Sequence, residues 1–281
     1  MFRVLAVVLL LGASLASQNP PDLLPDPAIA CDACAEWNRE REPSLVFGNT
    51  YSVGVAGLSS ILIASDAGLI LLDGGLPQSA PRIAQNIRKI GFRVQDVQLI
   101  VNSHAHYDHA GGIAALQRAS GATVAASADG ARALRQGGPT ADDPQFGLGP
   151  AVNRFPAVRE VRTIADGEVL RVGKLSITAH LTPGHTPGST TWSWRSCEAS
   201  HCRHLVYADS LNPVSAPGFR FSGDARTPTR VDAFRQSIKK VAALPCDILL
   251  AVHPQFGEGR SCAVYAADAL RRLEERLLAE R

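Results

Sequence analysis

Residues 103–112 read SHAHYDHAGG, and this stretch decides which fold the sequence favours. It places three of the chain's eight histidines and one aspartate within six consecutive positions, as His104, His106, Asp108 and His109. The continuously apolar run VQLIV (97–101) comes just before it and predicts a buried strand, whose end delivers the motif to a loop. Because neighbouring side chains point in different directions, this one segment can supply ligands to two adjacent metal ions.

Two further histidines stand where a metal site needs additional ligands. His185 lies in LTPGHTPGS (181–189), a glycine- and proline-rich turn after a predicted strand, and His253 ends the apolar run DILLAVHP (247–254). Either histidine alone is more often an ordinary turn or core residue, but a strand-end position beside the motif favours a metal ligand. The six candidates divide into two open sites of three ligands, as catalytic metal sites require. Imidazole and carboxylate suit Zn²⁺, with iron and manganese as alternatives.

The composition and the first residues limit the classes of protein to which the chain can belong. The chain has 281 residues, of which 46% are hydrophobic and 19% charged, with a formal net charge of +2. No run of Lys and Arg is interleaved with aromatic residues, so neither a nucleic acid nor an anionic membrane is an expected partner. The start, MFRVLAVVLLLGASLASQ, predicts a secretory signal peptide over residues 1–17, with an apolar run too short to span a bilayer. We expect a periplasmic monomer with one mature domain, residues 18–281.

Export makes the six cysteines candidates for disulfides, although six cysteines allow fifteen pairings. Cys197 and Cys202 flank EASH and are placed to close a small surface loop. Cys246 and Cys262 bracket a predicted strand and a loop. The remaining pair, Cys31 and Cys34, forms a C-x-x-C motif. This motif lacks the strand-then-helix context of a redox site, which favours a structural or local bridge.

The remaining pattern mixes strands and helices in both halves and predicts one α/β domain of two sheets with helices outside. Helices are predicted over residues 80–90, 112–121, 229–244 and 263–280. Strands are predicted within 51–75 and over 97–104, 122–127, 160–164, 168–172, 175–181, 190–194, 204–210 and 246–254. Residues 18–43 should be extended, and 136–156 should form a loop. The last helix carries a predicted apolar face of Val264, Ala267, Leu270, Leu273 and Leu277.

These residues carry a resemblance. HAHYDH, GHTPG, the DGG at 73–75 and the strand-end His253 together resemble the metallo-β-lactamase fold, across nearly the whole mature chain. Narrower features resemble subclass B3 of the metallo-β-lactamases: LTPGH, the run TTWSWRSCEASHCRHLVYADSL (190–211), ALPCDILL (243–250) and the Cys246–Cys262 spacing. The resemblance implies an αββα sandwich, in which two mixed sheets pack together with helices on their outer faces.

The resemblance also implies how the site works. His104, His106 and His185 would hold a first zinc ion, and Asp108, His109 and His253 a second. A metal-bound hydroxide would then cleave the ring amide of penicillins, cephalosporins or carbapenems without an acyl-enzyme. Ser210 and Asn212 would bind the substrate carboxylate, although the family has Ser or Thr where this chain has Asn212. The loop at 136–156 would form one wall of the cleft.

Two alternatives of different kinds remain open. The first is another hydrolase of the same fold, a lactonase or thioesterase. Such enzymes commonly bridge their metals with an aspartate near Asp209, and Asp209 is present in YADSL (207–211). The second is a zinc-binding protein without catalysis, which would close the coordination of each metal with protein ligands. Two groups of three ligands argue against this second alternative.

Overall fold

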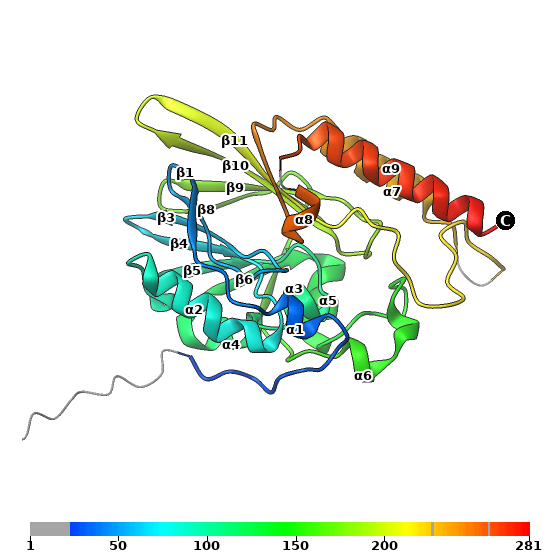
Figure 1. Ribbon diagram of the computed structural model, residues 1–281, viewed down its shortest axis with the longest axis horizontal. Coiled ribbons are helices and arrows are strands. Elements are labelled where there is room, and N and C mark those ends of the chain that lie inside the picture. The colour runs from blue at the N-terminus through cyan, green and yellow to red at the C-terminus, as the bar shows by residue number, and fades with distance from the viewer. Residues whose placement is uncertain (1–22, 226–227, 258) are drawn as a thin grey trace, which may run out of the picture.

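The computed structural model describes residues 23–225, 228–257 and 259–281, and its core is a sandwich of two β-sheets (Figure 1). The predicted signal peptide, residues 1–17, lies outside the described residues. Among those that are described, no helix is long and apolar enough to cross a membrane.

The first sheet has seven strands that follow one another in chain order. Its strands are β1 (Ser44–Phe47), β2 (Thr50–Ser52), β3 (Ile61–Ser65), β4 (Gly68–Leu72), β5 (Val97–Val101), β6 (Thr123–Ser127) and β7 (Val161–Ile164). Strands β1 to β4 pair antiparallel, and β4 to β7 pair parallel, so the sheet is mixed. The parallel half places the carboxyl ends of β4, β5 and β6 at one edge of the sandwich.

The second sheet has five strands in the order β12-β11-β10-β9-β8. They are β8 (Val169–Val172), β9 (Leu175–Leu181), β10 (Thr190–Glu198), β11 (His201–Ala208) and β12 (Ile248–Ala251). Strands β8 to β11 pair antiparallel, whereas β11 and β12 are parallel, so this sheet is mixed as well. Strands β10 and β11 form a long antiparallel hairpin, with Cys197 opposite Cys202 near its tip.

Helices cover the outer face of each sheet, which confirms the expected αββα arrangement. Figure 1 shows α2 and α4 on one side of the sandwich and α7 with α9 on the other. The helices are α1 (Cys34–Trp37), α2 (Ala80–Lys89), α3 (Tyr107–Ala110), α4 (Ile113–Ser120), α5 (Ala128–Gln136), α6 (Pro150–Asn153), α7 (Val231–Ala242), α8 (Pro254–Gly257) and α9 (Cys262–Ala279). Short 3₁₀ turns lie at Pro77–Ser79, Val94–Asp96 and Phe146–Leu148.

The alternation of side chains along each strand divides the core into layers. On β4, Leu69 and Leu71 pack against the helices of the first sheet, whereas Ile70 and Leu72 face the second sheet. On β11, Tyr207 faces the first sheet and Val206 packs under α7 and α9. A strand covered on both faces must be apolar on both, which explains the fully buried run GLILL of β4. In VQLIV of β5, four residues are buried and only Gln98 is exposed.

The C-terminal helix is present, but the predicted buried face was wrong. Helix α9 buries a face of Cys262, Tyr265, Ala266, Ala269 and Leu273. Of the predicted face, Leu273 is buried and Leu277 half-buried, but Ala267 is exposed and Val264 and Leu270 keep 50% and 40% of their surface exposed. Tertiary contacts rotate the helix: the Cys246–Cys262 disulfide holds its start, and Tyr265 donates a buried hydrogen bond to the Asp209 carbonyl oxygen (2.8 Å).

Two segments that were expected to lack helices contain short ones, and all six cysteines are paired. Within the segment expected to be extended, residues 34–37 form the short helix α1, and Cys31 pairs locally with Cys34 at its start. The loop at 136–156 contains one 3₁₀ turn and α6. Cys197–Cys202 and Cys246–Cys262 are paired, and the described residues include no free cysteine.

Candidate metal centre

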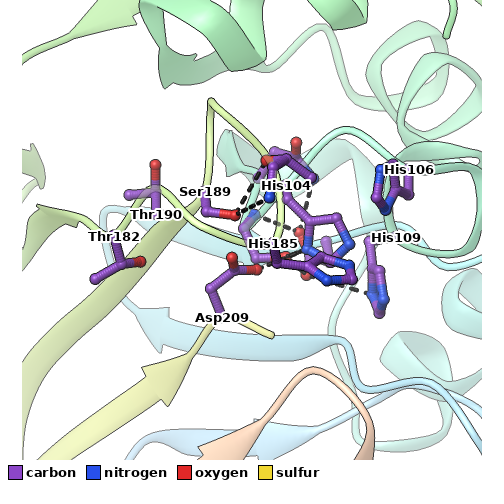
Figure 2. A network of polar contacts seen from close by, with 12 residues as sticks. His104, His106, His109, Thr182, His185, Ser189, Thr190 and Asp209 are labelled. Carbon is purple, nitrogen blue, oxygen red and sulfur yellow. Dashed lines mark hydrogen bonds and ion pairs between the residues drawn. The ribbon is translucent and has the colours of Figure 1, made fainter. Parts of the chain in front are cut away.

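The candidate metal ligands converge on one edge of the sandwich, from segments far apart in the sequence. The HAHYDH motif follows β5 and enters α3, and His185 lies in the turn between β9 and β10. His253 follows β12, and Asp209 follows β11. Figure 2 shows the imidazole rings of the motif beside the His185 ring. The His253 ring joins the cluster through His109, with 4.9 Å between ring centroids.

A buried carboxylate at the end of β4 holds the motif in place. Asp73 Oδ1 accepts the Ser103 N–H (2.7 Å) and the Asn102 side-chain amide (2.9 Å). Asp73 Oδ2 accepts the Ser103 hydroxyl (2.6 Å) and the Tyr207 hydroxyl (2.8 Å). These bonds fix the backbone one residue before His104, so the first candidate ligand leaves a rigid segment.

The first group of candidate ligands is His104, His106 and His185. All three side chains are buried, and their ligand atoms lie within 4.8 Å of one another. Ring centroids are 4.8 Å apart for His104 and His106, 4.7 Å for His104 and His185, and 5.0 Å for His106 and His185.

Each ring of this group donates its outward-facing N–H to an oxygen. His104 Nδ1 donates to Asp209 Oδ1 (2.6 Å), and His185 Nδ1 donates to the Asn212 carbonyl oxygen (2.8 Å). His106 uses its other nitrogen, Nε2, which donates to the Asp143 carboxylate (3.1 Å). An N–H on one side of a neutral imidazole leaves a lone pair on the other, so each ring is fixed in a metal-binding tautomer.

The second group is Asp108, His109 and His253, whose three ligand atoms lie close to one another. Asp108 Oδ2 lies 3.1 Å from His109 Nε2 and 3.3 Å from His253 Nε2, and the two nitrogens are 3.3 Å apart. His253 Nδ1 donates to the Gly57 carbonyl oxygen (3.2 Å), so its Nε2 presents a lone pair. These distances are short enough for one small cation such as zinc to contact all three ligand atoms.

The electrostatics of the first group favour the neutral imidazoles that bind metal, whereas in the second group a carboxylate and an imidazole act on each other. Burial lowers the pKa of His104 well below its ordinary value, and burial lowers the pKa of His185 to about 3. Burial alone would raise the pKa of Asp108, but His109 and His253 outweigh burial and hold that pKa well below its usual range. Burial alone would lower the pKa of His109, but Asp108 beside it outweighs burial and raises that pKa. The first group therefore offers neutral imidazoles, and the second group pairs an anionic carboxylate with His109; imidazole and carboxylate are both ligands that suit zinc.

Comparison with known proteins agrees with this geometry. Residues 53–193, about half of the chain, match the model of the metallo-beta-lactamase superfamily. The chain belongs to the metallo-beta-lactamase superfamily. Its solved structural neighbours are subclass B3 enzymes of that superfamily.

Three of these neighbours cover most of the chain. MEM-A1, a subclass B3 metallo-beta-lactamase isolated from a soil metagenome library, is 48% identical with a TM-score of 0.83, over 87% of this chain and 98% of that one. A B3 metallo-beta-lactamase described as having an active-site glutamic acid is 49% identical with a TM-score of 0.86, over 94% and 99%. MIM-1 from Novosphingobium pentaromativorans is 39% identical with a TM-score of 0.81, over 90% and 97%. The chain is accordingly a hydrolase of this superfamily.

Curated relatives in the superfamily are more distant and more varied. A probable metallo-hydrolase of Burkholderia pseudomallei is 29% identical over 69% of this chain and 64% of that protein. A hydroxyacylglutathione hydrolase of Anaeromyxobacter dehalogenans is 29% identical over 58% and 49%. The chain thus spans 64% and 49% of the length of these two relatives, whose names differ.

A cleft of about 340 Å³ opens onto members of both groups of candidate ligands. Ser210 and Asn212, predicted from the sequence, line it together with His106, Asp108, His185 and His253. Six further residues line the cleft and were not predicted from the sequence to be site residues: Trp37, Tyr107, Gln145, Val214, Gln255 and Phe256. Gln145 stands in the loop that was expected to form a wall. No local pattern signalled the others, because they come from α1, α3, α8 and the segment after β11.

Trp37 shows how a residue near the mature N-terminus reaches the cleft. Its ring lies 5.3 Å from the His253 ring between centroids. A Cβ on Gly57 would lie 2.5 Å from Trp37 Cδ1, so only glycine allows this approach. Because Gly57 also accepts the His253 N–H, α1 and the loop beneath it fix the orientation of His253.

Asp209 lies behind His104, away from the metal-facing nitrogen. Its side chain is fully buried, and Figure 2 shows it beside His104 and Ser189. Its Oδ1 accepts the Nδ1–H of His104, and its backbone N–H donates to Thr191 Oγ1 (3.2 Å). In this position Asp209 orients a candidate ligand, in contrast to the bridging role that the lactonase or thioesterase alternative assigns to it.

Proposed function

We propose that this chain hydrolyses the ring amide of β-lactam antibiotics with two zinc ions. The first would be held by His104, His106 and His185, and the second by Asp108, His109 and His253. The observation that carries the proposal is the convergence of two three-ligand groups on one cleft, in a chain whose solved neighbours are subclass B3 metallo-beta-lactamases. Three protein ligands leave a coordination position for water or substrate, as in other catalytic zinc sites.

The chain's own residues hold, orient and bind. Bound zinc would supply Lewis acidity and a water made nucleophilic near neutral pH. Asp209, Asp143 and Asn212 fix the imidazole tautomers of the first group through the hydrogen bonds described above. Because water is the nucleophile, Ser210 binds the substrate and does not attack it, and no acyl-enzyme forms.

The cleft also suits recognition of a carboxylate without a salt bridge. No Lys or Arg is present among the described residues that line it. Ser210 is buried and Asn212 is half-buried, and both line the cleft. We assign both as hydrogen-bond donors to the carboxylate that β-lactam antibiotics carry, with the second zinc adding the opposite charge.

Hydrolysis of a lactone or thioester is the second candidate function. The curated relatives favour it, since they include hydroxyacylglutathione hydrolases. The position of Asp209 argues against it, because its carboxylate engages the Nδ1–H of His104. We further propose that the enzyme acts in the periplasm, supported by the signal-like residues 1–17 and by three paired disulfides.

The test is hydrolysis of a carbapenem by the purified mature protein, followed by absorbance, with chelator and then with added zinc. We expect turnover that the chelator stops and zinc restores, and that His104→Ala abolishes without unfolding the domain. His201→Ala is the matched control, because His201 is exposed on the β10–β11 hairpin. Near-full activity of zinc-replete His104→Ala would overturn the assignment. Absent turnover in a protein shown to bind two zinc ions would favour the lactone or thioester alternative.

A further inference from the structure

The wall of the cleft is joined to a candidate metal ligand by one buried carboxylate. Asp143 lies in the loop between α5 and α6 and is only 5% exposed. Its two carboxylate oxygens lie 3.1 Å and 3.2 Å from His106 Nε2. No lysine or arginine pairs with it among the ion pairs of the described residues, so the imidazole N–H is its principal charge-compensating donor.

The same carboxylate organises the residue that faces the cleft. Asp143 Oδ1 accepts the backbone N–H of Gln145 (2.8 Å), and Gln145 lines the cleft. The carbonyl oxygen of Gln145 accepts the Asn153 side-chain amide (2.7 Å). The Pro144 carbonyl oxygen accepts the Ala216 N–H (2.9 Å). The wall is therefore a fixed turn with Asp143 at its base.

We propose that Asp143 is a positioning residue that sets both the zinc affinity of His106 and the place of Gln145 in the cleft. The inference rests on the proposed role of His106 as a ligand of the first zinc. By accepting the Nε2–H, Asp143 keeps the lone pair of His106 on Nδ1 and holds the ring at one angle. A carboxylate acceptor also makes the imidazole a stronger donor to the metal than an amide acceptor does.

The neighbouring Asp142 provides a matched control. Asp142 is next in sequence and equally acidic, but its side chain is 46% exposed and pairs with Arg132 (3.2 Å). Its carboxylate touches none of the six candidate ligands. Replacing Asp142 thus changes the charge of the same loop without changing the contact to His106.

The experiment measures zinc affinity by competition with a chromophoric chelator, for the full mature protein and four variants. We expect Asp143→Ala to weaken the first zinc site about ten- to a hundredfold, the range for loss of such a partner. Asp143→Asn should weaken it less, since its amide oxygen still accepts the Nε2–H. Asp142→Ala should bind zinc as the parent does. Gln145→Ala should also keep parental zinc affinity while changing the KM for a β-lactam.

The outcomes separate this inference from the proposed function. Parental zinc affinity in folded Asp143→Ala, with an unchanged melting temperature, would overturn it. An equal loss in Asp142→Ala would also overturn it, because it would trace the effect to loop charge alone. If Asp143→Ala fails to fold, Asp143→Asn decides, and parental affinity in that variant contradicts the role of the charge. Zinc binding is read without any antibiotic, so an enzyme inactive on β-lactams still tests the inference.

Discussion

At the scale of single residues, Asp73 shows how one buried group positions a whole site. Its backbone has φ of 59°, in the left-handed region that residues with side chains seldom occupy. The strain is offset by the four donors that converge on its carboxylate, from Asn102, Ser103 and Tyr207. The DGG sequence thus marks a turn that anchors the metal-binding segment from behind.

Asp73→Asn should destabilise the fold, because an amide NH₂ would face hydroxyl and N–H donors. An unsatisfied buried donor costs about 1–3 kcal/mol, so we expect a loss of about 2 kcal/mol or more in the free energy of unfolding. Urea denaturation measures it, with Asp66→Asn in the exposed β3–β4 turn as a control within about 0.5 kcal/mol of the parent. Equal stability of the two variants would show that Asp73 is not an anchor.

Ser210→Ala tests substrate recognition at the same scale. A hydrogen bond to a charged group contributes about 1.5–3 kcal/mol, so we expect KM for a β-lactam to rise roughly tenfold with kcat little changed. Steady-state kinetics at saturating zinc measure both constants. Ser200→Ala, in the exposed hairpin turn, is the control. An unchanged KM would remove Ser210 from the binding site.

At the scale of elements, helix α9 is fastened at both ends. Cys262 at its start pairs with Cys246, which lies just before β12. At its end, Glu280 accepts the backbone N–H groups of Phe221 and Ser222, both at 2.9 Å. These two attachments hold the helix over the second sheet, and they explain why Tyr265, rather than Val264, faces inward.

Replacing Cys246 and Cys262 by serine should lower the free energy of unfolding by about 3 kcal/mol, from the entropy of closing a loop of this length. The bridge spans 16 residues, whereas Cys197–Cys202 spans five. The matched double serine variant of that shorter bridge should cost about 2 kcal/mol. Chemical denaturation compares the two. A larger loss from the shorter bridge would contradict this loop-length account.

Glu280 should make the stability of this helix end depend on acid. Burial alone would raise the pKa of Glu280, but the hydrogen bond from Arg276 and those from residues 221 and 222 lower it from 4.5 to about 2. A carboxylate whose pKa is lowered by folding contributes its full stabilisation at pH values above its pKa in the unfolded chain. This stabilisation is lost as the pH falls toward 2. We expect Glu280→Gln to be less stable than the parent at pH 7 and the difference to shrink below pH 4. A gap that is constant with pH would exclude the ionised carboxylate as its cause.

At the scale of the whole molecule, the candidate metal centre joins the two halves of the sandwich. Four of the six ligands follow β5 of the first sheet, and His185 and His253 follow β9 and β12 of the second. A ligand that binds only the folded state stabilises it by RT ln(1 + L/Kd), where L is the free ligand concentration. Metal bound here therefore holds both sheets together.

Removal of metal should lower the melting temperature of the mature protein. At a zinc concentration about a thousand times the Kd, binding contributes roughly 4 kcal/mol, equivalent to about 10 °C for a domain of this size. Calorimetry before and after chelation measures the shift, and added zinc should reverse it. Magnesium serves as the control ion. A melting temperature that does not respond to zinc would place the metal outside the folded core.

Much of the fold and of the candidate site is predictable from the sequence. VQLIV and DILLAVHP are mostly apolar runs, and LSITAHL alternates apolar with polar residues as a strand with two different faces does. The ends of these three segments locate the motif, the GHTPG turn and His253. The close spacing of HAHYDH identifies four candidate ligands, because few other uses require such a cluster. The face of α9 was predicted wrongly, since alanine and leucine recur at several helical spacings and the neighbouring elements select among them.

The sequence by itself therefore determined the fold class and the six candidate ligands. Only the tertiary structure determined which oxygen accepts the N–H of each of three candidate histidine ligands. Asp143 is 37 residues from His106, Asp209 is 105 from His104, and Gly57 is 196 from His253. Such contacts have no periodicity or spacing to reveal them. They arise because a buried imidazole N–H must find an acceptor, and the packing of the two sheets determines which oxygen is within reach.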